Sequence, residues 1–144
     1  PVAVIPTHSI PQGIAALLAL NYQADLTANV AAMTNAMQEI ETGEVTTATR
    51  TASINGVKVA EGQIIGLHNG ELKVAGATVE ETVQALLEAM GAAEREIITL
   101  YYGEGVSQSE ADALAELLHE RWPDQEIEVV AGGQPHYHYI VSVE

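Results

Sequence analysis

The stretch from Glu44 to Val74, EVTTATRTASINGVKVAEGQIIGLHNGELKV, contains two Asn-Gly dipeptides, at residues 55–56 and 69–70. Each dipeptide lies between two short runs in which apolar and polar side chains alternate. Asn and Gly readily adopt the positive φ angles of a two-residue turn, so Asn-Gly between alternating runs predicts a β-hairpin. Two such hairpins in close succession predict an antiparallel meander in this part of the chain.

The run before the first turn, Glu44–Ile54, is rich in threonine and other β-branched residues, which favour an extended backbone. On such a strand Thr47, Thr49 and Thr51 would share one face, and Arg50 would point the opposite way. These residues fit either a solvated strand face or a polar groove for an anion. The sequence leaves both interpretations open.

Strands and helices alternate in the second half of the chain. Thr78 and Ser107 are each followed three residues later by a glutamate, a capping box that predicts a helix N-terminus. Apolar residues then recur at helical spacing and are expected to face the core: Val79, Val83, Leu86, Leu87 and Met90 in the first helix, and Ala111, Leu114, Leu118 and Trp122 in the second.

A strand–helix–strand unit is predicted over residues 97–130. Residues 97–102 (IITLYY) and the EIEVVA run that starts at Glu126 have the length of strands, and Pro123 ends the helix between them. Such a unit forms a right-handed parallel crossover. With a last strand in HYHYIVSV, residues 136–143, the sequence predicts an α/β (α+β) fold: a mixed sheet with helices packed mainly on one face.

The first 42 residues are predicted to be a short strand and two helices. Val2–Ile5 is an apolar run of strand length. Ser9 begins a Ser-x-x-Gln capping box, and Pro11 lies in the first turn, where its missing N–H is not needed. Asp25 caps the second helix, whose apolar side chains form one stripe: Leu26, Val30, Met33, Met37 and Ile40. We therefore expect two parts, residues 1–42 and residues 43–144.

Composition excludes several functional classes. The chain has 20 acidic against 5 basic residues, a formal net charge of −15. This charge disfavours binding to nucleic acid and to anionic membrane surfaces. No apolar run is long enough to span a bilayer. The absence of cysteine excludes disulfides and thiolate chemistry, and is compatible with the cytoplasm. The acidic surface fits either simple solubility or attraction of a basic partner.

The two ends of the sequence differ in character. PVAVIPT begins almost inside a buried-strand pattern, without a methionine or a polar leader. This start is expected of a piece cut from a longer polypeptide. The end, YIVSVE, finishes as a strand with a charged last residue, which fits a natural C-terminus.

A glycine-containing segment, YYGEGVS, links a predicted strand to a predicted helix, the position where phosphate-binding loops occur. It offers only Gly103 and Gly105, with Gln108 where a third glycine would stand. Glu104 would also place a carboxylate where the phosphate lies. A tight turn before a capped helix is the favoured interpretation.

Two histidines, His136 and His138, alternate on the predicted last strand and would therefore point to the same side. Two histidines in this arrangement have the geometry of two zinc ligands. A zinc site needs at least a third ligand, and no other motif in the sequence is spaced to supply one. Tyr137 and Tyr139 would occupy the opposite face, as candidates for the packed side. The sequence contains no Gly-x-Ser-x-Gly motif and no other nucleophile–base pattern.

Several stretches together resemble a known family: VIPTHSIPQGIAALLALN, ADLTANVAAMTNAMQEIETGEVTTATR, GVKVAEGQIIGLHNGELKV, EIITLYYGEGVSQSEADALAELL and PDQEIEVVAGGQPHYHYIVSVE. The chain resembles the C-terminal domain of the bacterial fatty-acid kinase A protein, a family also called dihydroxyacetone-kinase-like or YloV-type. The resemblance extends nearly from end to end. Its specific parts are GEVTxAxR, ITLYYGE and GGQPxYxYIxSVE.

The resemblance implies a division of labour. In that family an N-terminal kinase domain binds ATP and magnesium and phosphorylates a fatty acid presented by a separate DegV-like acyl-binding subunit, for phospholipid synthesis. The C-terminal domain is similar in fold to those acyl-binding proteins, so this chain is expected to adopt the C-terminal half of the DegV-like fold. Nothing in the chain resembles the ATP site. No catalytic residue, metal or cofactor is therefore expected in it.

The chain departs from the family pattern in three ways. The family domain begins earlier, with more of a Rossmann-like half, so residues 1–42 are expected to be a remnant of that half. Residues 132–135 are Gly-Gly-Gln-Pro where acyl-binding relatives carry His-Thr-Gly-Pro-Gly, which counts against fatty-acid binding. His136 and His138 replace apolar residues or proline, which counts against a shared metal site.

Three functions stay open from the sequence: a docking and regulatory domain that contacts the DegV-like subunit, an acyl-binding domain, and a metal-dependent hydrolase that uses His136 and His138. A homodimer is also left open. The docking function is preferred, with its surface expected at strand ends, where α/β sheets present ligands. The candidate residues are Tyr101, Tyr102, Gly103, Glu104, Gly105, Gly132, Gly133, Gln134, Pro135, His136, Tyr137 and His138.

Overall fold

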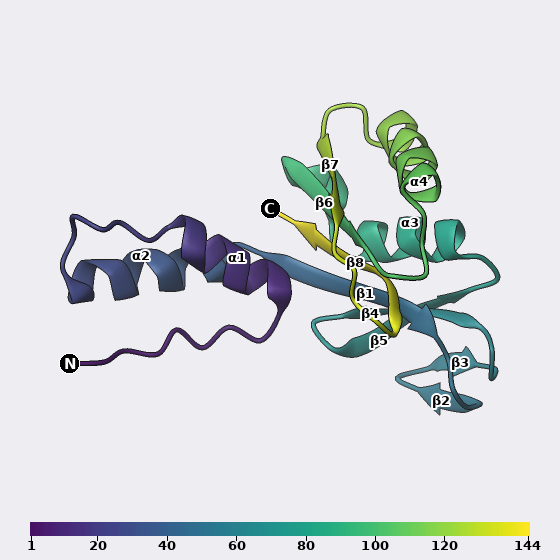
Figure 1. Ribbon diagram of the computed structural model, residues 1–144. Coiled ribbons are helices and arrows are strands. Elements are labelled where there is room, and N and C mark those ends of the chain that lie inside the picture. The colour runs from purple at the N-terminus through teal and green to yellow at the C-terminus, as the bar shows by residue number, and fades with distance from the viewer.

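The computed structural model describes all residues from 1 to 144. A six-stranded mixed sheet lies at its centre, in the order β5-β4-β1-β8-β6-β7 (Figure 1). Its strands are β1 (Glu41–Thr47), β4 (Ile64–His68), β5 (Glu71–Gly76), β6 (Ile97–Tyr102), β7 (Glu126–Ala131) and β8 (Tyr137–Val143). Only β6 and β7 are parallel, which confirms the predicted crossover. The predicted mixed-sheet fold class is confirmed.

Both Asn-Gly hairpins are confirmed, but they lie in different sheets. Asn69–Gly70 joins β4 to β5 within the main sheet, whereas Asn55–Gly56 joins β2 (Ala52–Ile54) to β3 (Val57–Val59) in a separate two-stranded sheet. All four turn residues have positive φ, as a type I′ turn requires. The predicted long strand is interrupted after Thr47, because the chain turns there and the small hairpin covers a second apolar cluster of Ala48, Val59 and Leu72.

Two helices cover one face of the main sheet: α3 (Val79–Ala89) and α4 (Gln108–Arg121). A short 3-10 helix, η1 (Ala92–Glu94), follows α3. The predicted start of each helix is confirmed. Thr78 caps α3 and Ser107 caps α4, and their side chains accept hydrogen bonds from the backbone N–H groups of Glu81 and Glu110. The interface between helices and sheet forms the main core: Val45, Val83, Leu86, Leu87, Met90, Ala92, Ile98, Leu100, Ala111, Leu114, Leu118, Trp122, Tyr139, Val141 and Val143.

The remaining two helices, α1 (Ile10–Leu18) and α2 (Leu26–Gln38), pack on each other and project away from the sheet (Figure 1). Ser9 caps α1 and Asp25 caps α2, as predicted. The predicted strand at Val2–Ile5 is wrong, because this segment is extended but pairs with no other strand. We call residues 1–38 the N-terminal arm.

Two glycines allow α3 to approach the sheet closely. A Cβ placed on Gly43 would lie 2.7 Å from Met90 Sδ and 2.8 Å from carbons of Leu86 and Val141. A Cβ on Gly66 would lie 2.6 Å from Val74 Cγ2. Neighbouring side chains already occupy the space at both places, so an added methyl group would clash with them.

We expect Gly43→Ala to lower the free energy of unfolding by roughly 1–3 kcal/mol, the usual penalty of overpacking a close-packed core. Chemical denaturation followed by circular dichroism measures this change. Gly105→Ala is the matched control, because a Cβ at Gly105 meets nothing within 4 Å. An equal loss in both variants would contradict the steric explanation.

Candidate functional site

The two predicted surface segments meet at the edge of the sheet where β6 and β7 end. The backbone N–H of Gly103 donates to the carbonyl of His138 (2.9 Å), and that of Glu104 donates to the carbonyl of Gln134 (3.0 Å). The side-chain amide of Gln134 donates to the carbonyl of Tyr101 (2.8 Å). Residues 101–105 and 132–138 therefore form one continuous surface, which we call the strand-end surface.

Gly103 is required where the two loops cross. A Cβ at this position would lie 2.2 Å from the carbonyl oxygen of Tyr137 and 2.8 Å from that of Gln134. The segment turns through Glu104 and Gly105 before the Ser107 cap of α4. The predicted tight turn before a capped helix is confirmed, and its glycine allows contact between two backbones.

A shallow cavity of about 230 Å³ lies on the strand-end surface. It is small for an organic ligand, since such pockets usually have about 300–1,000 Å³. Its lining is almost entirely polar: Glu104, Gly105, Gln134, His136, Tyr137 and His138. These loops therefore offer a contact surface with hydrogen-bonding groups.

The predicted alternation of His136 and His138 on one strand is wrong. His136 precedes β8 and has a φ of 69°, so it belongs to the turn. The β1–β8 register shifts between Val45 and Thr46, and Thr46 Oγ1 donates to the His136 carbonyl (2.6 Å). His138 Nε2 lies 2.9 Å from Thr47 Oγ1. No three His, Asp or Glu side chains anywhere in the structure come together in a metal-binding arrangement.

Two further predictions about side-chain direction have different outcomes. Tyr139 is buried in the main core, as predicted for the packed face of the last strand, whereas Tyr137 is only half-buried. The expectation that Thr47, Thr49 and Thr51 share a strand face is wrong, because β1 ends at Thr47. Thr51 instead accepts a hydrogen bond from the backbone of Glu61 (3.1 Å).

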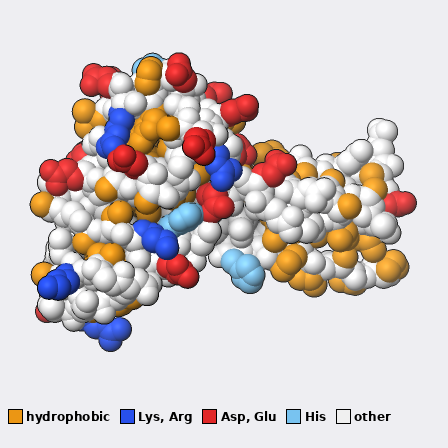
Figure 2. All heavy atoms as spheres, turned by 180° about the vertical axis from the view of Figure 1, so that it is seen from behind, with side chains coloured by type: hydrophobic (Ala, Val, Ile, Leu, Met, Phe, Trp, Pro, Cys, Tyr) orange, Lys and Arg blue, Asp and Glu red, His pale blue; other side chains and the backbone are white.

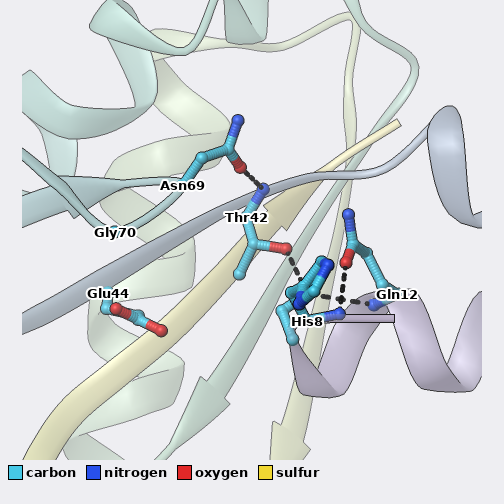
Figure 3. Close-up of a pocket in the computed structure, with 7 residues that line it drawn as sticks. His8, Gln12, Thr42, Glu44, Asn69 and Gly70 are labelled. Carbon is cyan, nitrogen blue, oxygen red and sulfur yellow. Dashed lines mark hydrogen bonds between the residues drawn. The ribbon is translucent and has the colours of Figure 1, made fainter. Parts of the chain in front are cut away.

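A second polar cavity, of about 330 Å³, lies between the start of α1 and the sheet (Figure 3). Ser9 Oγ lies 2.8 Å from Thr42 Oγ1, and Gln12 Oε1 accepts from the backbone N–H of His8 (2.9 Å). The lining contains no hydrophobic residue: His8, Ser9, Gln12, Thr42, Glu44, Asn69 and Gly70. The sequence did not indicate this cavity, because its residues come from three distant segments and were assigned only to caps, a strand and a turn.

Glu44 is the acidic residue in the lining of this cavity, and its carboxyl has a shifted pKa. Its side chain is partly buried, and burial raises the pKa of the Glu44 carboxyl above its ordinary value. No basic residue lines the cavity apart from His8. The ionised form of Glu44 is therefore held at a net disadvantage in the folded state.

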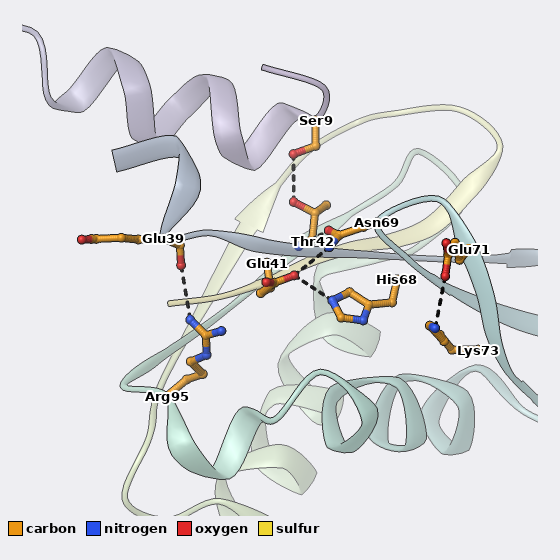
Figure 4. Close-up of polar contacts among 9 residues, drawn as sticks. All are labelled: Ser9, Glu39, Glu41, Thr42, His68, Asn69, Glu71, Lys73 and Arg95. Atoms are coloured by element: carbon orange, nitrogen blue, oxygen red, sulfur yellow. Dashed lines mark hydrogen bonds and ion pairs between the residues drawn. The ribbon is translucent and has the colours of Figure 1, made fainter. Parts of the chain in front are cut away.

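Polar contacts cluster where the N-terminal arm meets the sheet (Figure 4), and among them Ser9 of the arm contacts Thr42 of β1 (2.8 Å). Glu41, the first residue of β1, accepts hydrogen bonds from His68 Nε2 and Asn69 Nδ2, each at 2.8 Å. Arg95 Nη1 donates to the carbonyl of Glu39 at the end of α2 (3.3 Å). Partial burial acts to raise the pKa of Glu41, but the hydrogen bonds from His68 and Asn69 outweigh it and hold this pKa below its ordinary value.

The sequence matches known proteins along its whole length. A family model for the C-terminal part of proteins like fatty acid kinase A matches residues 1–144. This chain belongs to that family. Protein YloV of Bacillus subtilis is 38% identical over 143 residues, which cover 99% of this chain and 26% of YloV. An uncharacterised protein of Staphylococcus haemolyticus is 38% identical over 141 residues, 98% of this chain and 26% of its own length.

The fold is similar to that of two acyl-binding proteins. The fatty acid kinase B3 protein of Streptococcus pneumoniae, solved with linoleic acid, aligns at a TM-score of 0.54 and 14% identity, over 85% of this chain and 50% of that protein. A fatty-acid-binding DegV-family protein of Thermus thermophilus aligns at 0.53 and 18% identity, over 92% and 55%. The chain thus has a DegV-like fold and spans about a quarter of the length of its curated relatives.

The pKa values of Glu41 and Glu44 are shifted in opposite directions, so the two carboxyls are expected to have opposite effects on how stability depends on pH. The folded-state pKa of Glu41 is lowered, so its contribution is present above the unfolded pKa of 4.5 and is lost as the pH falls through the folded value. We expect Glu41→Gln to lower the melting temperature at pH 7 by about 1–3 °C. This deficit should shrink as the pH falls below 4.5, measured by calorimetric melts across the pH range.

Glu44→Gln is the control of opposite sign. The folded-state pKa of Glu44 is raised, so ionisation of this carboxyl above 4.5 destabilises the fold. The variant should melt higher than the parent chain at pH 7 and at the same temperature below pH 4.5. Equal shifts of the same sign in both variants would show that the changed side-chain size, and not charge, is responsible.

Proposed function

We propose that this chain is a non-catalytic docking domain of a fatty-acid kinase. In this proposal it contacts the DegV-like acyl-binding subunit that presents the fatty acid for phosphorylation in the cytoplasm. The family match supports a role within a kinase, and the DegV-like fold relates the domain to acyl-binding proteins. ATP and magnesium would be bound by a kinase domain elsewhere in the longer polypeptide.

The filled interface between helices and sheet is the observation that carries this proposal. An acyl chain needs an apolar chamber, and the space between α3, α4 and the sheet is occupied by fully buried aliphatic side chains, including Leu86, Leu87 and Leu100. Gly43 and Gly66 bring α3 and its neighbouring strands into such close contact that not even one extra carbon fits. The helix–sheet interface leaves no room for an acyl chain, and this supports a function carried by the surface of the domain.

The surface has properties that suit protein docking. The net charge of −15 attracts a basic partner over long range and accelerates encounter. The strand-end surface supplies exposed polar groups, among them Glu104, on loops held by backbone hydrogen bonds. No helix of the structure is both long and apolar enough to cross a membrane.

The proposal is tested by titrating this chain with the acyl-binding subunit of the same organism in a calorimeter. We expect binding that weakens as the salt concentration rises, since surface charges are screened. Glu104→Lys should weaken it at least about tenfold, a loss of 1.4 kcal/mol in binding free energy. Glu61→Lys is the matched control, an exposed glutamate on the loop between β3 and β4.

Two outcomes would contradict the proposal. One is the absence of any association between the pair at every salt concentration. The other is an equal loss in both lysine variants, which would indicate attraction to net charge without a defined surface. Native mass spectrometry of the freshly purified chain decides against acyl binding if only the apo mass is found, and in favour of it if a fatty acid remains bound.

A further inference from the structure

Two of the five basic residues have no partner, although the chain carries 20 acidic residues. Lys73, Arg95 and Arg121 each donate to a carboxylate or to a backbone carbonyl. Arg50 and Lys58 are exposed and form no ion pair with any acidic side chain. Both of them lie in the segment that contains the small hairpin of β2 and β3. The two uncompensated positive charges of the molecule are therefore close together in the sequence.

The hairpin forms a positively charged end of an otherwise acidic molecule. Residues 45–60 include these two basic residues and no acidic one, whereas the whole chain has a formal net charge of −15. Figure 2 shows Lys or Arg side chains at the end of the molecule farthest from the arm, where Figure 1 places β2 and β3. Exposed charges more than about 8 Å apart are largely screened at physiological ionic strength, so distant carboxylates act only weakly at this end.

An open hollow of about 580 Å³ lies at this hairpin. Its volume is within the usual range of ligand sites, about 300–1,000 Å³. Four other cavities of the structure each have at least one glutamate in their lining. The hollow at the hairpin has none and includes a lysine; its lining residues are Thr51, Ala52, Ser53, Lys58, Val59, Ala60 and Gln63. Its charge is therefore complementary to that of an anion.

The pairing of β2 with β3 places the polar residues of the hollow together. Ser53 lies directly opposite Lys58 in the antiparallel register, so the two side chains share one face of the hairpin. Thr51, two residues before Ser53, lines the same hollow. Val59 points to the other face and is buried in the second apolar cluster, which holds the hairpin against the main sheet.

The polar groups of the hollow have hydrogens available for donation. Thr51 Oγ1 accepts a hydrogen bond from a backbone N–H group (3.1 Å), and Gln63 Oε1 accepts one from another (3.0 Å). These contacts use acceptor atoms, so the Thr51 hydroxyl and the Gln63 Nε2 group keep their hydrogens free. The Ser53 hydroxyl and the Lys58 ammonium add two more donors. A ligand rich in acceptor oxygens matches this lining.

We propose that the hollow at the hairpin binds a phosphate monoester through Lys58, Ser53 and Thr51. Such a group carries a charge of about −1.5 to −2 and three strong acceptor oxygens, so it can accept from the ammonium and both hydroxyls at once. Lysine binds phosphate as a point charge. Arg50, which directly precedes Thr51, adds to the attraction. Of the threonines that the sequence analysis considered for an anion groove, only Thr51 belongs to this hollow.

The test is a titration of the ¹⁵N-labelled chain with glycerol phosphate at constant ionic strength, followed by amide chemical shifts in NMR spectra. We expect saturable shifts confined to residues 50–63, with a dissociation constant on the order of 1 mM. Acetate should bind at least about tenfold more weakly, because it has a single charge and fewer acceptor oxygens. The absence of shifts in this segment, or equal binding of acetate, would overturn the proposal.

Variants of exposed residues test the assignment of the binding groups. Lys58→Gln should weaken glycerol phosphate binding at least about tenfold, and Ser53→Ala about threefold. Lys73→Gln is the matched control, because Lys73 is also exposed and its ammonium is already paired with Glu71 (3.2 Å). This control should bind like the parent chain. An equal loss in the two lysine variants would show attraction to net charge without a defined site and would refute the proposal.

A second measurement distinguishes a soluble phosphate from a lipid headgroup of the same chemistry. The chain is sedimented with phosphatidylcholine vesicles that contain or lack phosphatidic acid, a lipid phosphate monoester. We expect no sedimentation with either, because the net charge of −15 repels an anionic surface. Sedimentation that requires phosphatidic acid and is lost in Lys58→Gln would support the phosphate site and assign its source to a lipid. Sedimentation that persists in Lys58→Gln would count against the site.

Discussion

The contact of α3 with strands β1 and β4 is the constraint on which the rest of this structure depends. Gly43 and Gly66 remove two side chains from the sheet at the place where Leu86 lies, so the helix rests almost on the backbone. The chain has no phenylalanine, and aliphatic side chains fill their space well only when the layers approach closely. This approach closes the interior and leaves the edges and outer surfaces of the sheet for contact with other groups.

The surfaces outside that core differ in chemistry, and the difference follows from position. The strand-end surface is polar because two loops cross there through backbone hydrogen bonds and leave side chains such as Glu104 and His136 outside. The arm is apolar and uncharged over its first 24 residues. The contact of Ser9 with Thr42 joins the arm to β1, and Arg95 holds Glu39, the residue that follows the arm.

Local patterns predicted most of the secondary structure, because their causes are local. The turns at Asn55–Gly56 and Asn69–Gly70 require positive φ, which these residues adopt readily. The capping box of Ser107 and Glu110 supplies hydrogen bonds to the backbone N–H groups at the start of its own helix. Features that depend on distant residues were not predictable in this way. The register shift between β1 and β8, which leaves His138 without a partner on β1 just after β8 begins, depends on how these two strands pair. The cavity around Glu44 combines three segments, and the strand predicted at Val2–Ile5 finds no partner within these residues.

Strand β1 connects the two surfaces directly. It begins shortly after α2 ends, and its last residues, Thr46 and Thr47, bond to the turn carbonyl of His136 and the ring of His138. Seven extended residues make a stiff rod of about 23 Å, at roughly 3.3 Å per residue. Because β1 is hydrogen-bonded to β4 on one side and to β8 on the other, it is held in place along its length. The arm and the histidine-bearing loop are therefore anchored at opposite ends of one inner strand, at a separation fixed by the sheet.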